Sequence, residues 1–236
     1  MSRYLLASLL LLAVNPLGAE VLDKTTKIAG MMVHYKVVLP KDYDKTKAYP
    51  AVLGFGGGPQ NMGTVDSVIS RNFRAEAEKR GYIVVVPAAP DDQLFFEGGQ
   101  RIFPQFLKQI LADYKIQDNK FHAAGPSNGG ISAFYIAALN PDYFLSITAF
   151  PGHLWEPTPA HIKAISKMCV SMFVGENDPM GWQDLMESQA QQFRSQGISA
   201  TYTVEKGQPH RLETLAGPGA HRLFDLFDKA QHGCGK

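Results

Sequence analysis

Short apolar runs alternate with segments of helical periodicity along most of this chain, and that alternation constrains the fold more than any other feature. The run 82–87 (YIVVVP) is typical of a strand buried on both faces. Because parallel neighbours cannot be joined by short hairpins, repeated β-then-α order predicts an α/β fold with a doubly wound, mostly parallel sheet and helices on both faces. The expected strands are 33–39, 51–55, 82–87, 120–124, 145–150, 168–175 and 200–205, and the expected helices are 65–80, 102–114, 129–140, 182–196 and 215–231.

Apart from the expected helices, no insertion of 30 or more residues separates these strands. We therefore predict a single domain, residues 20–236, without a large lid domain.

The first nineteen residues have the layout of a secretory signal peptide. Arg3 precedes the apolar run 4–14, and Asn15-Pro16 and the small pair Gly18-Ala19 follow it. The alternative is a membrane anchor, but the run has eleven residues and a spanning helix needs about 20. We expect export to the periplasm or the medium, and no stable membrane association after removal of residues 1–19.

Charge and composition bear on the partners. The chain has 23 Lys+Arg against 22 Asp+Glu and no basic run, so nucleic acid is not an expected partner. No group of His, Cys, Asp and Glu has metal-ligand spacing, and we predict no metal and no cofactor. Nothing in the sequence predicts an oligomeric state. In an oxidising compartment Cys169 and Cys234 either form a disulfide or stay apart as a buried and a free thiol.

A G-x-S-x-G motif, Gly125-Pro126-Ser127-Asn128-Gly129, lies directly between an expected strand and an expected helix. This is the context of a nucleophile elbow, a turn so tight that small residues must flank the serine. The alternative is a glycine-rich turn in which the serine only caps the helix, since serine is a favoured N-cap residue. The strand-to-helix position favours Ser127 as a catalytic nucleophile.

Two further strand ends carry the partners that a serine nucleophile needs. Asp178 follows the strand 168–175, and His210 follows the strand 200–205. The histidine would take the serine proton, and the carboxylate would fix the tautomer of the imidazole. Glu176 and Asp142 are the rival acids; among the histidines only His210 has the required loop position.

These motifs give the chain a resemblance to the α/β-hydrolase superfamily. The elbow GPSNGG, the acid loop GENDP, the histidine loop GQPH and the glycine loop GFGGGP are similar to those of small exported esterases of the polyhydroxyalkanoate depolymerase, feruloyl esterase and carboxylesterase type. The resemblance implies hydrolysis of an ester or related acyl bond through an acyl-serine intermediate, with no metal and no organic cofactor.

The glycine loop resembles the His-Gly-Gly-Gly loop of lipases and esterases, with Phe55 where that family often has histidine. Glycines let backbone N–H groups approach a substrate oxygen, as an oxyanion hole requires. We expect the donors to be the N–H groups of Phe55 or Gly56 together with that of Asn128, the residue after the nucleophile.

The substrate is the least constrained part of the prediction. The candidates for substrate binding are Trp155, His153, Phe96 and Met180, with ordinary packing or surface exposure as the alternative. We expect a small-molecule or polymer-end ester as the substrate. The alternatives are a serine peptidase resembling the prolyl oligopeptidase family, acting on short peptides, and a non-catalytic binding domain.

Overall fold

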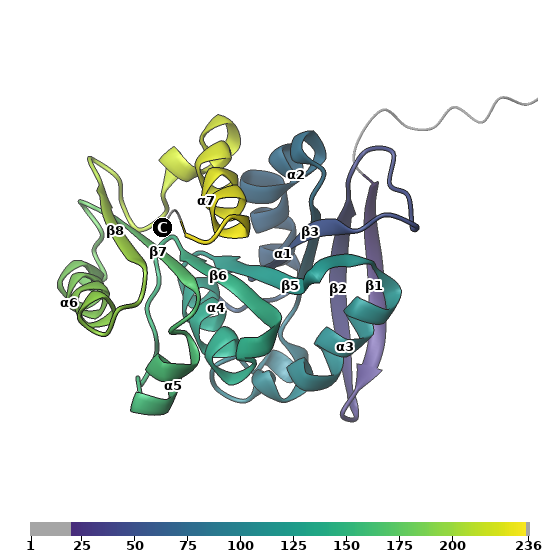
Figure 1. Cartoon of the computed structure of the whole chain (residues 1–236), viewed down its shortest axis with the longest axis horizontal. Coiled ribbons are helices and arrows are strands. Elements are labelled where there is room, and N and C mark those ends of the chain that lie inside the picture. Colours follow the sequence, from purple (N-terminus) through teal and green to yellow (C-terminus); the bar gives the residue numbers. More distant parts are fainter. Residues whose placement is uncertain (1–19, 235–236) are drawn as a thin grey trace, which may run out of the picture.

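A twisted eight-stranded sheet runs through the centre of the computed structural model, which describes residues 20–234 (Figure 1). The strand order is β1-β2-β4-β3-β5-β6-β7-β8. The strands β1 and β2 are antiparallel to each other, β2 is antiparallel to β4, and all other neighbours are parallel. The strands are β1 (Glu20–Ile28), β2 (Met31–Leu39), β3 (Tyr49–Gly54), β4 (Ile83–Pro87), β5 (Ile116–Gly125), β6 (Phe144–Ala149), β7 (Cys169–Gly175) and β8 (Ala200–Glu205).

Helices cover both faces of the sheet (Figure 1). One layer holds α1 (Met62–Val68), α2 (Arg74–Arg80) and α7 (His221–Gln231). The other holds α3 (Phe103–Asp113), α4 (Asn128–Leu139), α5 (Pro159–Ala164) and α6 (Trp182–Ser195). In β4 the side chains of Val84 and Val86 pack into the first layer and those of Ile83 and Val85 into the second, as the two-residue period of a strand requires. The predicted fold class is confirmed, and no large lid is present among residues 20–234.

The structure differs from the sequence analysis at several elements, among them the helix α5, which was not expected. The strand β1 was not predicted, because only Ile28 of its nine residues is fully buried and its polar residues hide the strand pattern. The last helix begins at His221, because two 3₁₀ turns, Glu213–Leu215 and Gly217–Ala220, precede it, and the second contains Gly217, at φ 52°, and Pro218. The expected helix 65–80 contains a π-helical turn, Ile69–Phe73, between α1 and α2.

The proposed signal peptide, residues 1–19, lies outside the described residues. None of the helices within residues 20–234 is long and apolar enough to cross a membrane.

A disulfide joins Cys169, at the start of β7, to Cys234, just after α7. Of the two alternatives left open by the sequence, the structure has the bridge. The bond closes a loop between residues 65 positions apart, and on the chain-entropy model such a loop contributes about 4 kcal/mol to stability. The bridge therefore holds the end of α7 against the sheet.

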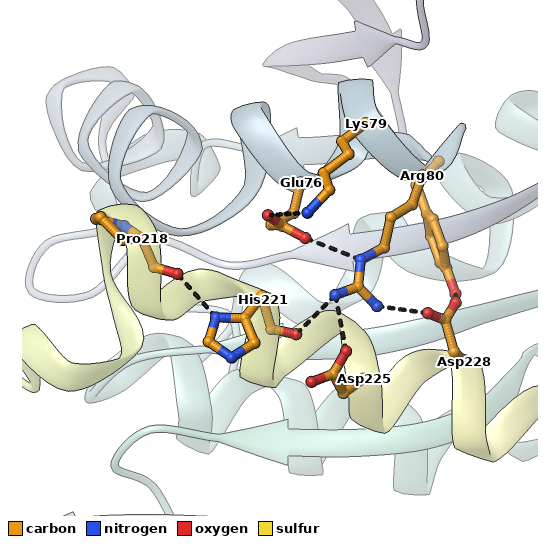
Figure 2. A network of polar contacts seen from close by, with 8 residues as sticks. Glu76, Lys79, Arg80, Pro218, His221, Asp225 and Asp228 are labelled. Carbon is orange, nitrogen blue, oxygen red and sulfur yellow. Dashed lines mark hydrogen bonds and ion pairs between the residues drawn. The ribbon is translucent and has the colours of Figure 1, made fainter.

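Arg80, the last residue of α2, fixes α2 against α7 (Figure 2). Its guanidinium forms ion pairs with Glu76 at 2.8 Å, Asp225 at 2.7 Å and Asp228 at 2.6 Å. The carboxylate of Asp228 also accepts a hydrogen bond from the hydroxyl of Tyr82 at 2.6 Å. Burial, followed by the hydrogen bond to Asp228, raises the pKa of Tyr82 above its usual range.

We expect Arg80→Ala to lower the free energy of unfolding by about 2–3 kcal/mol, because it leaves three carboxylates without their shared cation. Lys79→Ala is the matched control. Lys79 belongs to the same helical turn and also pairs with Glu76, but at 3.7 Å and with a side chain 70% exposed. Its removal should change stability by no more than about 0.5 kcal/mol. Urea unfolding of both variants measures the difference; equal losses would contradict the role given to Arg80.

Candidate active site

Ser127 lies on a sharp turn between β5 and α4, above the carboxyl end of the sheet. Its backbone has φ 56° and ψ −126°, an unusual conformation for a residue with a side chain, and its N–H donates to the carbonyl of Pro151 at 2.7 Å. A Cβ atom on Gly125 would lie 2.6 Å from the carbonyl oxygen of Phe55, and one on Gly129 would clash with the same oxygen. The glycines of the motif are therefore required by close backbone approach, as in a nucleophile elbow.

The structure brings Ser127, His210 and Asp178 together at this edge. The Nε2 atom of His210 lies 2.9 Å from Oγ of Ser127, and its Nδ1 atom lies 2.8 Å from Oδ2 of Asp178. The second carboxylate oxygen of Asp178 accepts the N–H of Met180 at 2.8 Å, and the Asp178 side chain is fully buried. A histidine that donates from Nδ1 to a carboxylate has Nε2 free to accept a proton from the serine hydroxyl.

The two rival acids, Glu176 and Asp142, have other positions and other partners in the structure. Oε2 of Glu176 accepts the N–H of Gly207 at 2.8 Å, and the N–H of Asn177 donates to the carbonyl of Gln208 at 2.8 Å. These bonds tie the acid loop to the histidine loop, so Glu176 supports the loop that presents His210. Asp142 lies in a turn before the amino end of β6, at the opposite edge of the sheet.

At the glycine loop the structure excludes Phe55 as an oxyanion donor. The N–H of Phe55 donates to the carbonyl of Ala124 at 2.9 Å, so it extends the sheet ladder and is not available to a substrate. Its ring packs in the core against Phe95 and Phe103. Within residues 20–234, the N–H groups of Gly56 and Asn128 donate to no other protein group.

Gly57 was not among the expected donors. It approaches the nucleophile so closely that a Cβ atom there would lie 3.6 Å from Cβ of Ser127. Its N–H, too, has no protein acceptor among the described residues. The N–H of Gly57 therefore joins those of Gly56 and Asn128 as a donor candidate.

Gln60 is the functional candidate that the sequence analysis missed. Its side chain is fully buried directly beneath the glycine loop. In the sequence it is one polar residue in a loop, and no periodicity or motif distinguishes it.

Aromatic rings extend in a row from His210. Trp182 contacts His210 edge to face at 5.1 Å between ring centroids, and His153 at 5.0 Å. Trp155 follows at 6.0 Å from His153, and Phe96 at 5.9 Å from Trp155. Burial lowers the pKa of His153, so its ring is neutral at neutral pH. Of the four expected substrate-binding residues, His153, Trp155 and Phe96 lie in this aromatic row.

Met180, the fourth, is 58% exposed, and its backbone N–H bonds Asp178. Trp155 is 40% exposed, so the aromatic row presents a ring face that a ligand can reach.

A cavity of about 260 Å³ lies on the other side of the elbow. Its walls come from the glycine loop, from α1 and the following π-helical turn, and from the residues after His210. The apolar part of its lining consists of Val68, Pro126, Phe150 and Leu212. Such a volume holds a small acyl or aromatic group.

Two of the other histidines, His122 and His221, make contacts within the fold and not in the candidate active site. His122 is fully buried in the core, 2.7 Å from Oγ of Ser146, and burial lowers its pKa to about 3. His221 is the first residue of α7 and bonds the carbonyl of Pro218. Among the described residues no group of three His, Cys, Asp or Glu side chains could hold a metal ion.

Comparison with known proteins gives one sequence relative and several structures. The chain is 31% identical over 163 residues to dipeptidyl-peptidase 5 of Porphyromonas gingivalis. The matched segment is 59% of this chain but only 24% of that protein, so the chain spans about a quarter of its length.

Among solved structures, a feruloyl esterase module from Clostridium thermocellum superimposes with a TM-score of 0.67 at 16% identity, over 93% of this chain and 89% of that one. A dienelactone hydrolase-like phosphotriesterase from metagenomic libraries gives 0.66 at 14% identity, over 92% and 99%. A thermostable esterase gives 0.65 at 17% identity, over 91% and 62%. At these identities the superpositions establish the shared fold.

The family model described as "Putative esterase" matches residues 26–225, which include the elbow, the acid loop, the histidine loop and the glycine loop. With this match over most of its length, the chain belongs to the esterase family and has the α/β-hydrolase fold.

Proposed function

We propose that this esterase-family protein is a serine carboxylic ester hydrolase with Ser127 as nucleophile, His210 as general base and Asp178 as the acid that orients the histidine. The observation that carries the proposal is the continuous hydrogen-bonded chain from Oγ of Ser127 through both ring nitrogens of His210 to the buried carboxylate of Asp178. The link from Ser127 to His210 has the length that a proton transfer requires, and the link from His210 to Asp178 has the length needed to orient the ring.

The first half of the reaction forms an acyl-enzyme. Oγ of Ser127 attacks the ester carbonyl carbon while its proton passes to Nε2 of His210. The carbonyl oxygen becomes an oxyanion, which the N–H groups of the glycine loop and Asn128 stabilise. The carbon–oxygen bond to the alcohol then breaks, and His210 returns the proton to the leaving alcohol oxygen.

The second half repeats these steps with water. His210 takes a proton from a water molecule, whose oxygen attacks the acyl carbon. The bond to Oγ of Ser127 breaks, Ser127 regains its proton from His210, and the carboxylic acid leaves. The buried Asp178 stabilises the imidazolium that exists in both halves. The proposed mechanism uses only side chains, backbone N–H groups and water.

We propose a small-molecule or polymer-end ester as the substrate. The cavity beside the elbow would take one part of the ester, and the aromatic row beside His210 would contact the other. We also propose that residues 1–19 direct export and that residues 20–236 act as one domain in the periplasm or the medium.

A serine peptidase is the second candidate. The similarity to dipeptidyl-peptidase 5 favours it, but that similarity covers only 24% of that protein. The same serine, histidine and aspartate would serve amide hydrolysis, with His210 protonating an amine instead of an alcohol.

The test is turnover of p-nitrophenyl esters from acetyl to long acyl chains, beside methyl ferulate and a proline-containing anilide. We expect ester cleavage with a preference for acyl groups that fit a cavity of about 260 Å³. A fluorophosphonate should label Ser127, as mass spectrometry of the tryptic peptide would detect. Anilide cleavage without ester cleavage would establish the peptidase instead. No turnover and no labelling would favour a non-catalytic binding domain.

A further inference from the structure

Gln60 is a fully buried amide in the loop that follows the three glycines. Its Oε1 atom accepts the N–H of Phe95 at 3.0 Å. Its Nε2 atom lies 2.8 Å from Oγ of Ser132, in α4, and 3.2 Å from the carbonyl oxygen of Gly56. A buried amide is costly unless its polar atoms are paired, so this side chain is held in one orientation.

The backbone of Gln60 adds two more connections. Its N–H donates to the carbonyl of Gly57 at 3.2 Å, and its carbonyl accepts the N–H of Ala89 at 2.8 Å. Its φ of 54° is a strained value for a residue with a side chain, and such strain persists only where surrounding contacts impose it. Gln60 thus connects the glycine loop, the helix behind Ser127 and the loop after β4.

These bonds fix the direction of the N–H groups in the glycine loop. The carbonyl of Gly56 and the N–H of Gly57 belong to one planar peptide, so a bond that holds the carbonyl also holds the N–H, which points the opposite way. The side-chain Nε2 atom of Gln60 bonds the Gly56–Gly57 peptide, and its backbone N–H bonds the carbonyl of the next peptide, Gly57–Gly58. Nε2 also lies 3.4 Å from the carbonyl oxygen of Asn128, the residue that carries the other candidate donor.

We infer that Gln60 is the positioning residue of the oxyanion-binding loop. Its amide clamps the Gly56–Gly57 peptide to Ser132 of α4, and this clamp keeps the N–H of Gly57 at a fixed spacing from the N–H of Asn128. The inference rests on the proposed function, because an oxyanion forms only if Ser127 attacks an acyl carbon. Phe55 has no polar side-chain atom with which to brace the loop, and the amide of Gln60, five residues further along the chain, supplies that brace.

The test separates positioning from folding. Gln60→Met keeps the approximate size of the side chain but removes both the amide donor and the acceptor. A loop donor that moves by about 1 Å costs about 100-fold in rate, so we expect kcat to fall about 100-fold with KM changed by less than about threefold. A trifluoromethyl ketone, which forms a tetrahedral adduct with the serine, should lose affinity by a similar factor.

Gln231→Met is the matched control, since Gln231 also pairs its amide with a buried group, Nε2 of His122 at 2.9 Å, but lies at the end of α7. It should lower the melting temperature while kcat and ketone affinity stay within about threefold of wild type. Ser132→Ala removes one partner of the Gln60 amide without changing the loop, and it should lower kcat several-fold even if Gln60→Met does not fold.

Wild-type kcat and ketone affinity in Gln60→Met, or in Ser132→Ala where Gln60→Met does not fold, would overturn the inference and leave the esterase proposal intact. A parallel loss of ketone affinity in Gln231→Met would also overturn it, because the effect would then come from stability alone. A wild-type protein that neither cleaves esters nor binds the ketone would overturn the proposed function instead.

Discussion

Replacing Ser127 with alanine is expected to lower kcat for the best ester by about 10⁶-fold, the size of effect found when the nucleophile of a serine hydrolase is removed. Oγ of Ser127 is the only protein atom in the proposed mechanism that forms a bond to the acyl carbon. The hydrogen bond from Ser127 to His210 would be lost, but the backbone of the elbow is held by Gly125, Gly129 and the bond to Pro151. We therefore expect the fold to remain and fluorophosphonate labelling to disappear.

Ser171→Ala is the matched control for this variant. Ser171 is a buried serine that lies within β7. It should keep wild-type turnover and labelling, as single-turnover kinetics and intact mass would measure. If Ser127→Ala retains the wild-type rate, the acyl-serine mechanism is wrong.

The parts of the site that could be predicted are those encoded by short, contiguous stretches of sequence. The elbow is a five-residue pattern at a strand-to-helix junction, and its geometry follows from Gly125, Ser127 and Gly129. Asp178 and His210 were predicted because each follows an expected strand, and the carboxyl ends of parallel strands converge at one edge of the sheet.

The parts that could not be predicted depend on residues far apart in the chain. Gln60 and Ser132 are separated by 72 positions, and nothing local to either marks the bond between them. The strand β1 is defined by its pairing with β2 and hardly by its own pattern. Of the two alternative donors expected in the glycine loop, Phe55 or Gly56, the structure excludes Phe55 for a similar reason, because the bond from its N–H to Ala124 belongs to the pairing of two strands.

The approach of Cys169 to Cys234 depends on where α7 ends against β7. The row of rings from His210 to Phe96 likewise depends on the packing of three loops and the start of α6. For both features the sequence supplied the residues, and tertiary packing decided which of them meet.

The second large effect is expected at Asp178, which the proposed mechanism distinguishes from its neighbour Glu176. Asp178→Asn replaces an acceptor of the Nδ1 proton of His210 by a group that can donate to Nδ1. A donation to Nδ1 leaves the proton on Nε2, and Nε2 then cannot accept the proton of Ser127. We expect kcat to fall about 10⁴-fold with little change in KM, because the defect lies in proton transfer.

Glu176→Gln is the control for this substitution, since it removes a carboxylate two residues away and keeps an oxygen that can accept the N–H of Gly207. It should leave kcat within about threefold of wild type. The reverse ranking of the two variants would assign the acid to Glu176. Steady-state kinetics on the same ester decides between them, because both changes are isosteric and only Asp178→Asn removes the carboxylate bonded to Nδ1 of His210.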